Sequence, residues 1–313
     1  MSIAFLFPGQ GSQSVGMGKA LAESFEEARD VFSEVDDTLD QHLSKLMFEG
    51  DQDQLTDTRN AQPALMAVSV AVTRVLEKQS GKSIQELCQF VAGHSLGEYS
   101  ALCAAGAISL SDTARLLRTR GTAMQEAVPP GQGGMVALVG TDFETAQDIA
   151  NQASSKGPCQ AANDNGGGQV VVSGAMAAVD QVITIAQEKG IKRAVKLPVS
   201  APFHSTMMEP AAIVMKDALA GTNVISPSVP LIANVTASEV TDPQTIKDLL
   251  VDQVTGMVRW RESMLHLAEK NVNHVVECGA GKVLAGLMRR IDKEIATTCI
   301  GTPEDIESYI ETL

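Results

Sequence analysis

A serine that could act as a nucleophile lies at the centre of the segment VAGHSLGEYSA, residues 91–101. The segment contains the pattern G-x-S-x-G, which is typical of a serine presented on a sharp turn between a strand and a helix. Gly93 and Gly97 are the small neighbours that such a strained turn requires. A helix starting at Leu96 would direct N–H groups and its positive dipole end at the reacting oxygen. Ser95 is therefore a candidate nucleophile, and a serine that only caps the helix is the alternative interpretation.

A nucleophilic serine needs a base, for which the chain offers five histidines: His42, His94, His204, His266 and His274. His204 follows a proline-containing loop at an expected junction between two subdomains, where site residues are often found. It is the candidate base, with a histidine merely packed in its loop as the alternative. Of the others, His94 adjoins Ser95 and should point elsewhere. His42 and His266 lie in polar helical contexts, and His274 begins a strand. No acidic residue stands out as the group that orients the base, so a carboxylate and a backbone carbonyl both remain open.

Arginines cluster around the segment LLRTRGTAMQEAV, residues 116–128. Most helical arginines are simply solvated, but Arg120 differs because Gly121 and apolar residues follow it. A buried arginine at this position would need an anion, and a guanidinium binds a carboxylate through two parallel hydrogen bonds.

Two glycine-containing segments lack the patterns of phosphate-binding loops. FLFPGQGSQ, residues 5–13, has neither G-x-G-x-x-G nor GK[ST], and GAGKVLAG, residues 279–286, carries Val283 where Ser or Thr is required. A backbone N–H of the first segment could instead complete an oxyanion hole beside the serine.

The elements that must position these residues follow from the hydrophobic pattern. Strands are expected at 3–7, 89–93, 230–235 and 274–279, and helices at 62–77, 96–105 and 282–291. This alternation predicts a mostly parallel sheet covered on both faces. Between residues 129 and 198 the pattern predicts strands at 134–140, 159–163, 169–173 and 192–198, with helices at 143–155 and 177–189. Their order, β-α-β-β-α-β, is that of a ferredoxin-like unit.

The predicted fold class is therefore α/β. Residues 1–128 and 199–313 are expected to form a large α/β-hydrolase-like subdomain with a mostly parallel sheet. Residues 129–198 are expected to form a small inserted ferredoxin-like subdomain.

Composition excludes several classes of function. The 313 residues carry a net charge of −14, which argues against nucleic-acid binding and against a peripheral membrane protein. The apolar segment 64–72 is far shorter than the ~20 residues of a membrane span. The five cysteines are odd in number and have no C-x-x-C spacing, which favours a reducing cytoplasm over disulfides or zinc. No Lys or Arg precedes Lys19, so no signal peptide is expected.

Motifs spread in order over almost the whole chain resemble the malonyl-CoA:acyl carrier protein transacylase family of bacterial type II fatty acid synthesis. They are FPGQGSQ (7–13), QPAL (62–65), GHSLGEYSAL (93–102), RG followed by MQEAV (120–128), PVSAPFHS (198–205), NV (234–235) and VVECGAGKVLAGL (275–287).

The resemblance implies a role for each matching residue. Ser95 resembles the acylated nucleophile, and His204 its general base and later acid. Gln253 resembles the family residue whose main-chain carbonyl orients that histidine, so no acidic third member is implied. The segment DQVTGMVRW, residues 252–260, departs from the family pattern because it lacks the usual Pro before Val-x-Trp.

The resemblance implies substrate-binding roles for four further residues. Arg120 resembles the partner of the malonyl carboxylate, and the backbone N–H groups of Gln10 and Leu96 resemble the oxyanion hole. Phe203, before His204, resembles the residue associated with malonyl rather than bulkier methylmalonyl groups.

The implied activity is transfer of malonyl from malonyl-CoA to the phosphopantetheine thiol of acyl carrier protein, through a malonyl-serine intermediate. No permanently bound cofactor, no metal and a cytoplasmic monomer are expected. The carrier protein is acidic, so a local basic patch must dock it; the candidates are Lys282, Arg289, Arg290 and Lys293, expected on one helix, and Lys192, Arg193 and Lys196. Solvated helix faces are the alternative for these cations. The rival functions are an esterase that uses the same serine and histidine, and a catalytically silent docking module.

Overall fold

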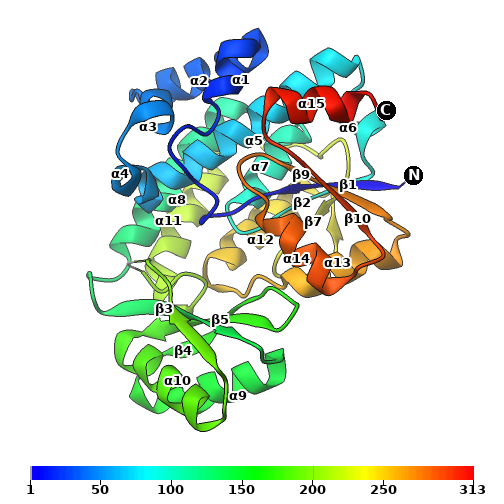
Figure 1. Cartoon of the computed structure of the whole chain (residues 1–313). Helices are drawn as coiled ribbons and strands as arrows, with labels where there is room; N and C mark the ends of the chain where they lie inside the picture. The colour runs from blue at the N-terminus through cyan, green and yellow to red at the C-terminus, as the bar shows by residue number, and fades with distance from the viewer. Residues whose placement is uncertain (1, 200) are drawn as a thin grey trace.

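The computed structural model describes residues 2–199 and 201–313, so Ser200 of the segment PVSAPFHS lies outside the described residues. Figure 1 shows a large upper part, built from both ends of the chain, and a smaller lower part built from its middle. Each part contains one β-sheet, and the fold is α/β as predicted.

The sheet of the large part has six strands in the order β10-β9-β1-β2-β7-β8. The first five run parallel, and the last is antiparallel to its neighbour. The strands are β1 (Ile3–Phe7), β2 (Phe90–Gly93), β7 (Leu231–Ile232), β8 (Glu239–Val240), β9 (His274–Cys278) and β10 (Ala296–Ile300).

Both faces of this sheet are buried, as the sequence predicts for parallel strands. Along β1, Phe5 and Phe7 enter the main hydrophobic core, whereas Ala4 and Leu6 enter a second core on the opposite face. Helices α13 and α14 cover that second face, and most other helices pack on the first. The helices of the large part are α1 (Lys19–Ser24), α2 (Glu26–Leu39), α3 (Leu43–Glu49), α4 (Gln52–Thr56), α5 (Thr58–Ser80), α6 (Ile84–Leu87), α7 (Gly97–Ala104), α8 (Leu110–Glu126), α11 (Glu209–Ala220), α12 (Pro243–Thr255), α13 (Trp260–Glu269), α14 (Val283–Ile291) and α15 (Pro303–Ile310).

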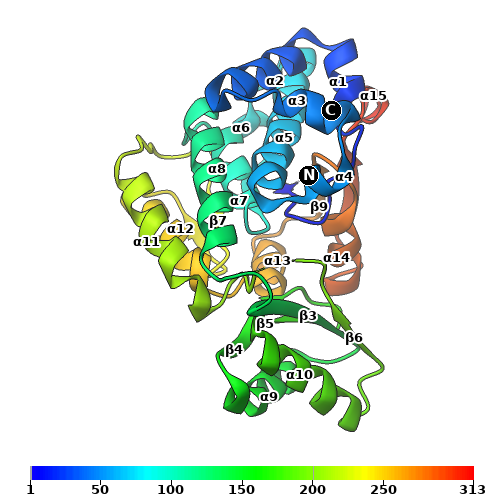
Figure 2. The same ribbon diagram turned by 90° about the vertical axis from the view of Figure 1, so that its left-hand side faces the viewer.

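The sheet of the small part has four antiparallel strands in the order β4-β5-β3-β6. In chain order its elements are β3 (Gly133–Val139), α9 (Phe143–Ala153), β4 (Cys159–Asp164), β5 (Gln169–Ala175), α10 (Met176–Glu188) and β6 (Arg193–Lys196). This arrangement confirms the ferredoxin-like prediction. Helices α9 and α10 cover the face turned away from the large part (Figures 1 and 2). Met135 and Val171, on the other face, join the main core of the large part.

Two predicted elements differ from the structure in ways that concern the site. The strand expected at 230–235 ends at Ile232, because the chain turns through Ala237 with a φ of 51° and Asn234 leaves the ladder to bond elsewhere. The helix expected at 282–291 begins at Val283 and ends at Ile291. Lys282 and Lys293 therefore flank α14 rather than lie on it. Among the described residues, no helix has the length and apolar character needed to cross a bilayer.

Candidate active site

Ser95 lies between the end of β2 and the start of α7, on a turn strained in the way G-x-S-x-G predicts. Its φ is 54°, a value that residues other than glycine rarely adopt. The turn also needs its flanking glycines: a Cβ on Gly97 would lie 2.2 Å from the carbonyl oxygen of Phe7. A Cβ on Gly93 would lie 1.9 Å from the backbone of Gly97. The tight approach of β1, β2 and α7 therefore allows no side chain at either position.

The side-chain amide of Asn234 stabilises this turn with two hydrogen bonds. The backbone N–H of Ser95 donates to Asn234 Oδ1 over 2.8 Å, and Asn234 Nδ2 donates to the carbonyl oxygen of Gly93 over 2.7 Å. One buried side-chain amide thus satisfies a donor and an acceptor that the turn leaves without partners in the sheet.

His204 reaches Ser95 from the loop before α11. Its Nε2 lies 2.8 Å from Ser95 Oγ. Its Nδ1 lies 2.8 Å from the carbonyl oxygen of Gln253 and 3.1 Å from that of Gly256. Because both carbonyls can only accept, Nδ1 carries the proton and the lone pair of Nε2 faces the serine hydroxyl. Backbone carbonyls thus orient the histidine, which resolves the alternative that the sequence left open.

The surroundings of His204 keep it neutral. The side chain is buried, with 3% of its surface exposed, and its φ is 56°. Burial, followed by the nearby Arg120 cation, lowers the pKa of His204 to about 3. A neutral imidazole can accept the serine proton, so the pair has the geometry of an activated nucleophile.

Arg120 points from α8 into the same site. It is 1% exposed, and its Nη2 donates to Ser95 Oγ over 3.1 Å and to Gln253 Oε1 over 2.8 Å. Its Nη1 donates to Gln62 Oε1 over 2.8 Å, and its guanidinium lies 5.7 Å from the ring centroid of Tyr99. Burial lowers the pKa of Arg120 from its ordinary value. Among the described residues no carboxylate lies within ion-pair distance of this guanidinium.

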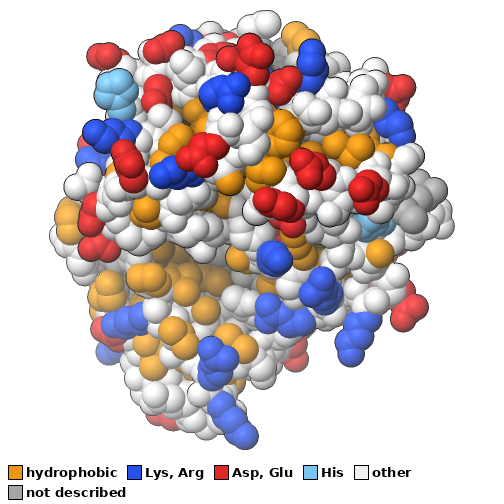
Figure 3. Space-filling view, turned by 45° about the horizontal axis from the view of Figure 1, so that its top comes forward, with side chains coloured by type: hydrophobic (Ala, Val, Ile, Leu, Met, Phe, Trp, Pro, Cys, Tyr) orange, Lys and Arg blue, Asp and Glu red, His pale blue; other side chains and the backbone are white. Residues whose placement is uncertain are grey.

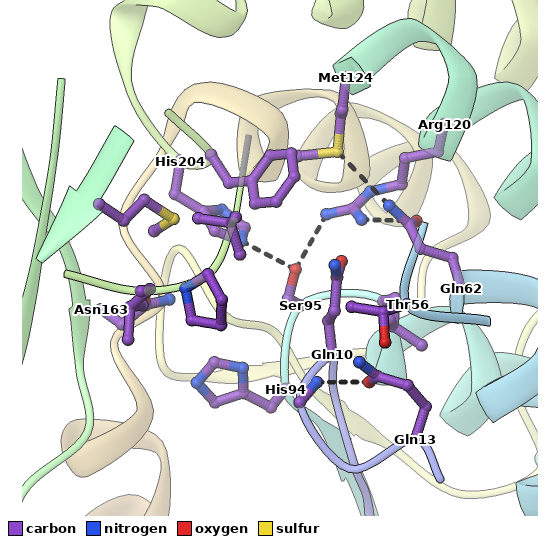
Figure 4. A pocket seen from close by; sticks show the side chains of 17 residues that line it. Gln10, Gln13, Thr56, Gln62, His94, Ser95, Arg120, Met124, Asn163 and His204 are labelled. Atoms are coloured by element: carbon purple, nitrogen blue, oxygen red, sulfur yellow. Dashed lines mark hydrogen bonds between the residues drawn. The ribbon is translucent and has the colours of Figure 1, made fainter. Parts of the chain in front are cut away.

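A cavity of about 220 Å³ opens above Ser95, between the large sheet and the small one (Figure 4). The predicted site residues Gln10, Leu96 and Phe203 line it together with Ser95, His204 and Arg120. Gln10 follows β1, and its side chain donates to Thr58 over 3.0 Å, while Leu96 immediately precedes α7. Gln253 is fully buried behind this lining. The structure thus brings all seven predicted site residues together.

Comparisons with known proteins show the family of the chain. The family model described as an acyl transferase domain matches residues 4–300. The malonyl CoA-acyl carrier protein transacylase of Bacillus subtilis strain 168 is 46% identical over 312 residues, which cover 99% of this chain and 97% of the relative. The chain belongs to the malonyl CoA-acyl carrier protein transacylase family. It is an acyltransferase.

Solved structures of this transacylase family superpose closely on the chain. The acyl-carrier-protein-S-malonyltransferase of Bartonella henselae has a TM-score of 0.96 and 56% identity, covering 100% of this chain and 99% of that one. A malonyl-transacylase solved in complex with its type II PKS acyl-carrier protein has a TM-score of 0.96 and 36% identity, and the match covers 100% of both chains.

The other histidines of this transacylase lie apart from the Ser95 hydroxyl. His94 Nε2 lies 2.9 Å from Asn165 Oδ1 of the small part, and the His94 ring packs 5.4 Å from that of Trp260. His42 is exposed. The ring of His266 lies 3.5 Å from a carboxylate of Glu239, and that of His274 bonds to Thr298.

Sequence reasoning missed two buried polar residues of the transacylase site. Asn234 appeared only within the motif NV, and Glu98 only within GHSLGEYSAL, without a role for either. Both are 1% exposed. Burial raises the pKa of Glu98 to about 7, against the opposing effect of the hydrogen bond from Gln253. Polar residues inside an otherwise apolar pattern were the only sequence signal that could have found them.

Proposed function

We propose that the chain transfers the malonyl group from malonyl-CoA to the phosphopantetheine thiol of acyl carrier protein, through a malonyl ester on Ser95. The names of its relatives support this substrate pair, and so does the solved relative in complex with its type II PKS acyl-carrier protein. The observation that carries the proposal is the position of Arg120. A buried guanidinium that has no carboxylate partner within the described part of the chain, 3.1 Å from the serine oxygen, is suited to bind the free carboxylate of the acyl group.

The first half-reaction forms the acyl-enzyme. His204 Nε2 takes the hydroxyl proton as Ser95 Oγ attacks the thioester carbonyl. The backbone N–H groups of Gln10 and Leu96 are proposed to hold the oxyanion, because both residues line the cavity beside Ser95 and Leu96 begins the turn into α7. The C–S bond then breaks, and coenzyme A leaves as the thiol with the proton from His204.

The second half-reaction reverses these steps with a new thiol. The phosphopantetheine thiol gives its proton to His204 and attacks the malonyl ester. The ester C–O bond breaks, Ser95 regains its proton and malonyl leaves on the carrier protein. Since a thioester is consumed and another is formed, no co-reactant or permanently bound cofactor is needed.

Specificity is proposed to depend on two residues. Arg120 selects acyl groups that carry a carboxylate. Phe203, which lines the cavity and is 8% exposed, is proposed to restrict the space beside the malonyl α-carbon and so to disfavour methylmalonyl.

Docking of an acidic carrier protein is proposed to use the cations at the C-terminal end of α14. Figure 3 shows a face on which Lys and Arg gather beside a hollow lined by hydrophobic side chains. Arg289 donates to the hydroxyl of Thr297, and Arg290 donates to the carbonyl of Gly286. Neither arginine has an ion-pair partner among the described residues. Lys196 of β6 is paired with Asp180 at 2.5 Å and is therefore the weaker candidate.

We also propose that the protein works as a cytoplasmic monomer in two units, 1–128 with 199–313 and 129–198. Its five cysteines are free, which fits a reducing compartment.

The function is tested by incubating the protein with malonyl-CoA and analysing it by mass spectrometry. Carrier protein is then added. We expect a malonyl adduct on Ser95 that moves to the carrier protein. An adduct that is lost only to water would favour the esterase, and no adduct would favour a silent docking module. In Arg120→Ala we expect the preference for malonyl over acetyl to disappear; if it persists, the carboxylate role is wrong.

A further inference from the structure

Glu98 is a buried carboxylate that lies one turn beyond the nucleophile and does not line the cavity. It projects from the first turn of α7. Its Oε2 accepts a hydrogen bond of 2.5 Å from Gln253 Nε2 and one of 3.4 Å from the backbone N–H of Asn234. Burying an ionisable group is costly unless its partners are arranged to hold it.

The side-chain amide of Gln253 lies between Glu98 and Arg120. Its Oε1 accepts from Arg120 Nη2 over 2.8 Å. Its Nε2 donates to Glu98 and, over 2.9 Å, to the carbonyl oxygen of Ser95. An amide turned by 180° would direct its N–H₂ group at the guanidinium donors and its oxygen at the carboxylate and the carbonyl. With the carboxyl of Glu98 ionised, every one of these contacts would then be repulsive, so the partners at both ends determine one orientation.

We propose that Glu98 is a positioning residue for Arg120: its carboxylate holds the Gln253 amide in the orientation that presents Oε1 to the guanidinium. Arg120 is thereby kept over Ser95, where its guanidinium can meet an acyl carboxylate. This inference rests on the proposed function, since it concerns how the same site recognises malonyl. Glu98 lies outside the cavity lining and accepts from Gln253, so its effect is transmitted through the amide of Gln253.

The main chain and the side chain of Gln253 act separately. The carbonyl that orients His204 belongs to the last turn of α12 and is placed by that helix, whereas the amide is placed by its hydrogen bonds. Loss of the amide orientation should therefore disturb Arg120 and spare His204. Transfer of malonyl should suffer, and transfer of acetyl, which has no carboxylate, should not.

Two conservative variants separate the hydrogen-bond acceptor from the charge. Glu98→Gln keeps an oxygen in reach of Gln253 Nε2 and removes the charge, and we expect it to retain the malonyl preference within about threefold. Glu98→Asp keeps the charge and withdraws the acceptor by one methylene. We expect kcat/KM for malonyl-CoA to fall about tenfold in this variant, as for loss of one hydrogen bond to a charged group, while that for acetyl-CoA stays within twofold.

Glu277 provides the matched control. It is equally buried, at 1% exposed, and accepts from the backbone N–H groups of Leu284 and Ala285 at the start of α14, away from the cavity. Glu277→Asp and Glu277→Gln should change thermal stability without changing the ratio of malonyl to acetyl acylation.

A double-mutant cycle tests the route through Gln253. Gln253→Met removes the amide and keeps the main-chain carbonyl, so we expect a loss of malonyl transfer to which Glu98→Asp adds nothing. The inference is overturned if Glu98→Asp loses malonyl and acetyl transfer equally, or if its malonyl preference is unchanged. It is also overturned if Glu98→Gln is as impaired as Glu98→Asp, or if the effects of the two substitutions in the cycle multiply. A wild-type protein that acylates Ser95 with acetyl as readily as with malonyl would instead overturn the proposed function, and the inference would fall with it.

Discussion

The state of His204 predicts an unusual pH profile for acylation of Ser95. A histidine acts as a base only when it is neutral, and an ordinary histidine with a pKa near 6.5 becomes charged as the pH falls below that value. The folded protein holds the pKa of His204 at about 3, through burial and the Arg120 cation. The sign of the effect is therefore clear: a lowered pKa keeps the base neutral under acidic conditions that would protonate an exposed histidine.

The size of the effect follows from the two pKa values. At pH 5 a histidine with a pKa of 6.5 would be neutral in only about 3% of molecules, a loss of about 30-fold relative to pH 8. His204, with a pKa of about 3, would remain about 99% neutral at the same pH. We therefore expect the acylation rate constant to change less than twofold between pH 8 and pH 5.

The assay uses p-nitrophenyl acetate, whose acyl group has no carboxylate to pair with Arg120. The burst of nitrophenol in stopped-flow measurements reports acylation, and circular dichroism at each pH confirms that the protein is folded. Arg120→Gln removes the cation that helps to lower the pKa of His204, so its rate should begin to fall at a higher pH than that of the wild type. A wild-type rate that falls about 30-fold with a midpoint near pH 6.5 would refute the reasoning.

Three experiments test the turn and the docking face. Asn234→Ala leaves the Ser95 N–H without its acceptor. We expect the free energy of unfolding, measured by urea denaturation, to fall by about 1–3 kcal/mol and acylation to become slower. Unchanged values would show that Asn234 does not stabilise the turn. Gly97→Ala places a Cβ 2.2 Å from the carbonyl at the end of β1, so its melting temperature should fall by several degrees, and a wild-type melting curve would contradict the packing. Charge reversal at Arg289 and Arg290 should raise KM for carrier protein severalfold and leave KM for malonyl-CoA unchanged; an unaltered KM for carrier protein excludes this patch.

Local patterns were enough to predict the elements that carry the nucleophile. An apolar run, a glycine and a helical segment in succession predicted β2, the Ser95 turn and α7, because each feature depends on residues close in sequence. The order of elements in the small sheet was predictable for the same reason. The length of β7 was not, because that strand ends where Asn234 must turn to a partner 139 residues away in the chain.

The polar framework beneath the serine could not be derived from spacing. The contact between Gln253 Nε2 and the Ser95 carbonyl spans 158 residues, and that between His204 Nδ1 and the Gln253 carbonyl spans 49. No periodicity encodes such pairs, and a backbone carbonyl leaves no side-chain signal at all. Only the family resemblance pointed to Gln253, and the only sequence signal for Glu98 was a polar residue inside an otherwise apolar pattern.

We propose that the position of Arg120 gives the malonyl carboxylate a part in the chemistry as well as in binding. In the free enzyme the guanidinium donates to Ser95 Oγ and lowers the pKa of His204, and both effects restrain the nucleophile. A carboxylate paired with Arg120 would draw these donors toward itself and offset the positive charge. The pKa of His204 should then rise toward the working pH, which makes the imidazole a stronger base at the moment when the acyl carbon is in place. Malonyl should therefore exceed acetyl in the single-turnover rate constant for acylation at saturating thioester, and not only in affinity. Equal rate constants at saturation, with a difference in KM alone, would mean that Arg120 serves binding and nothing more.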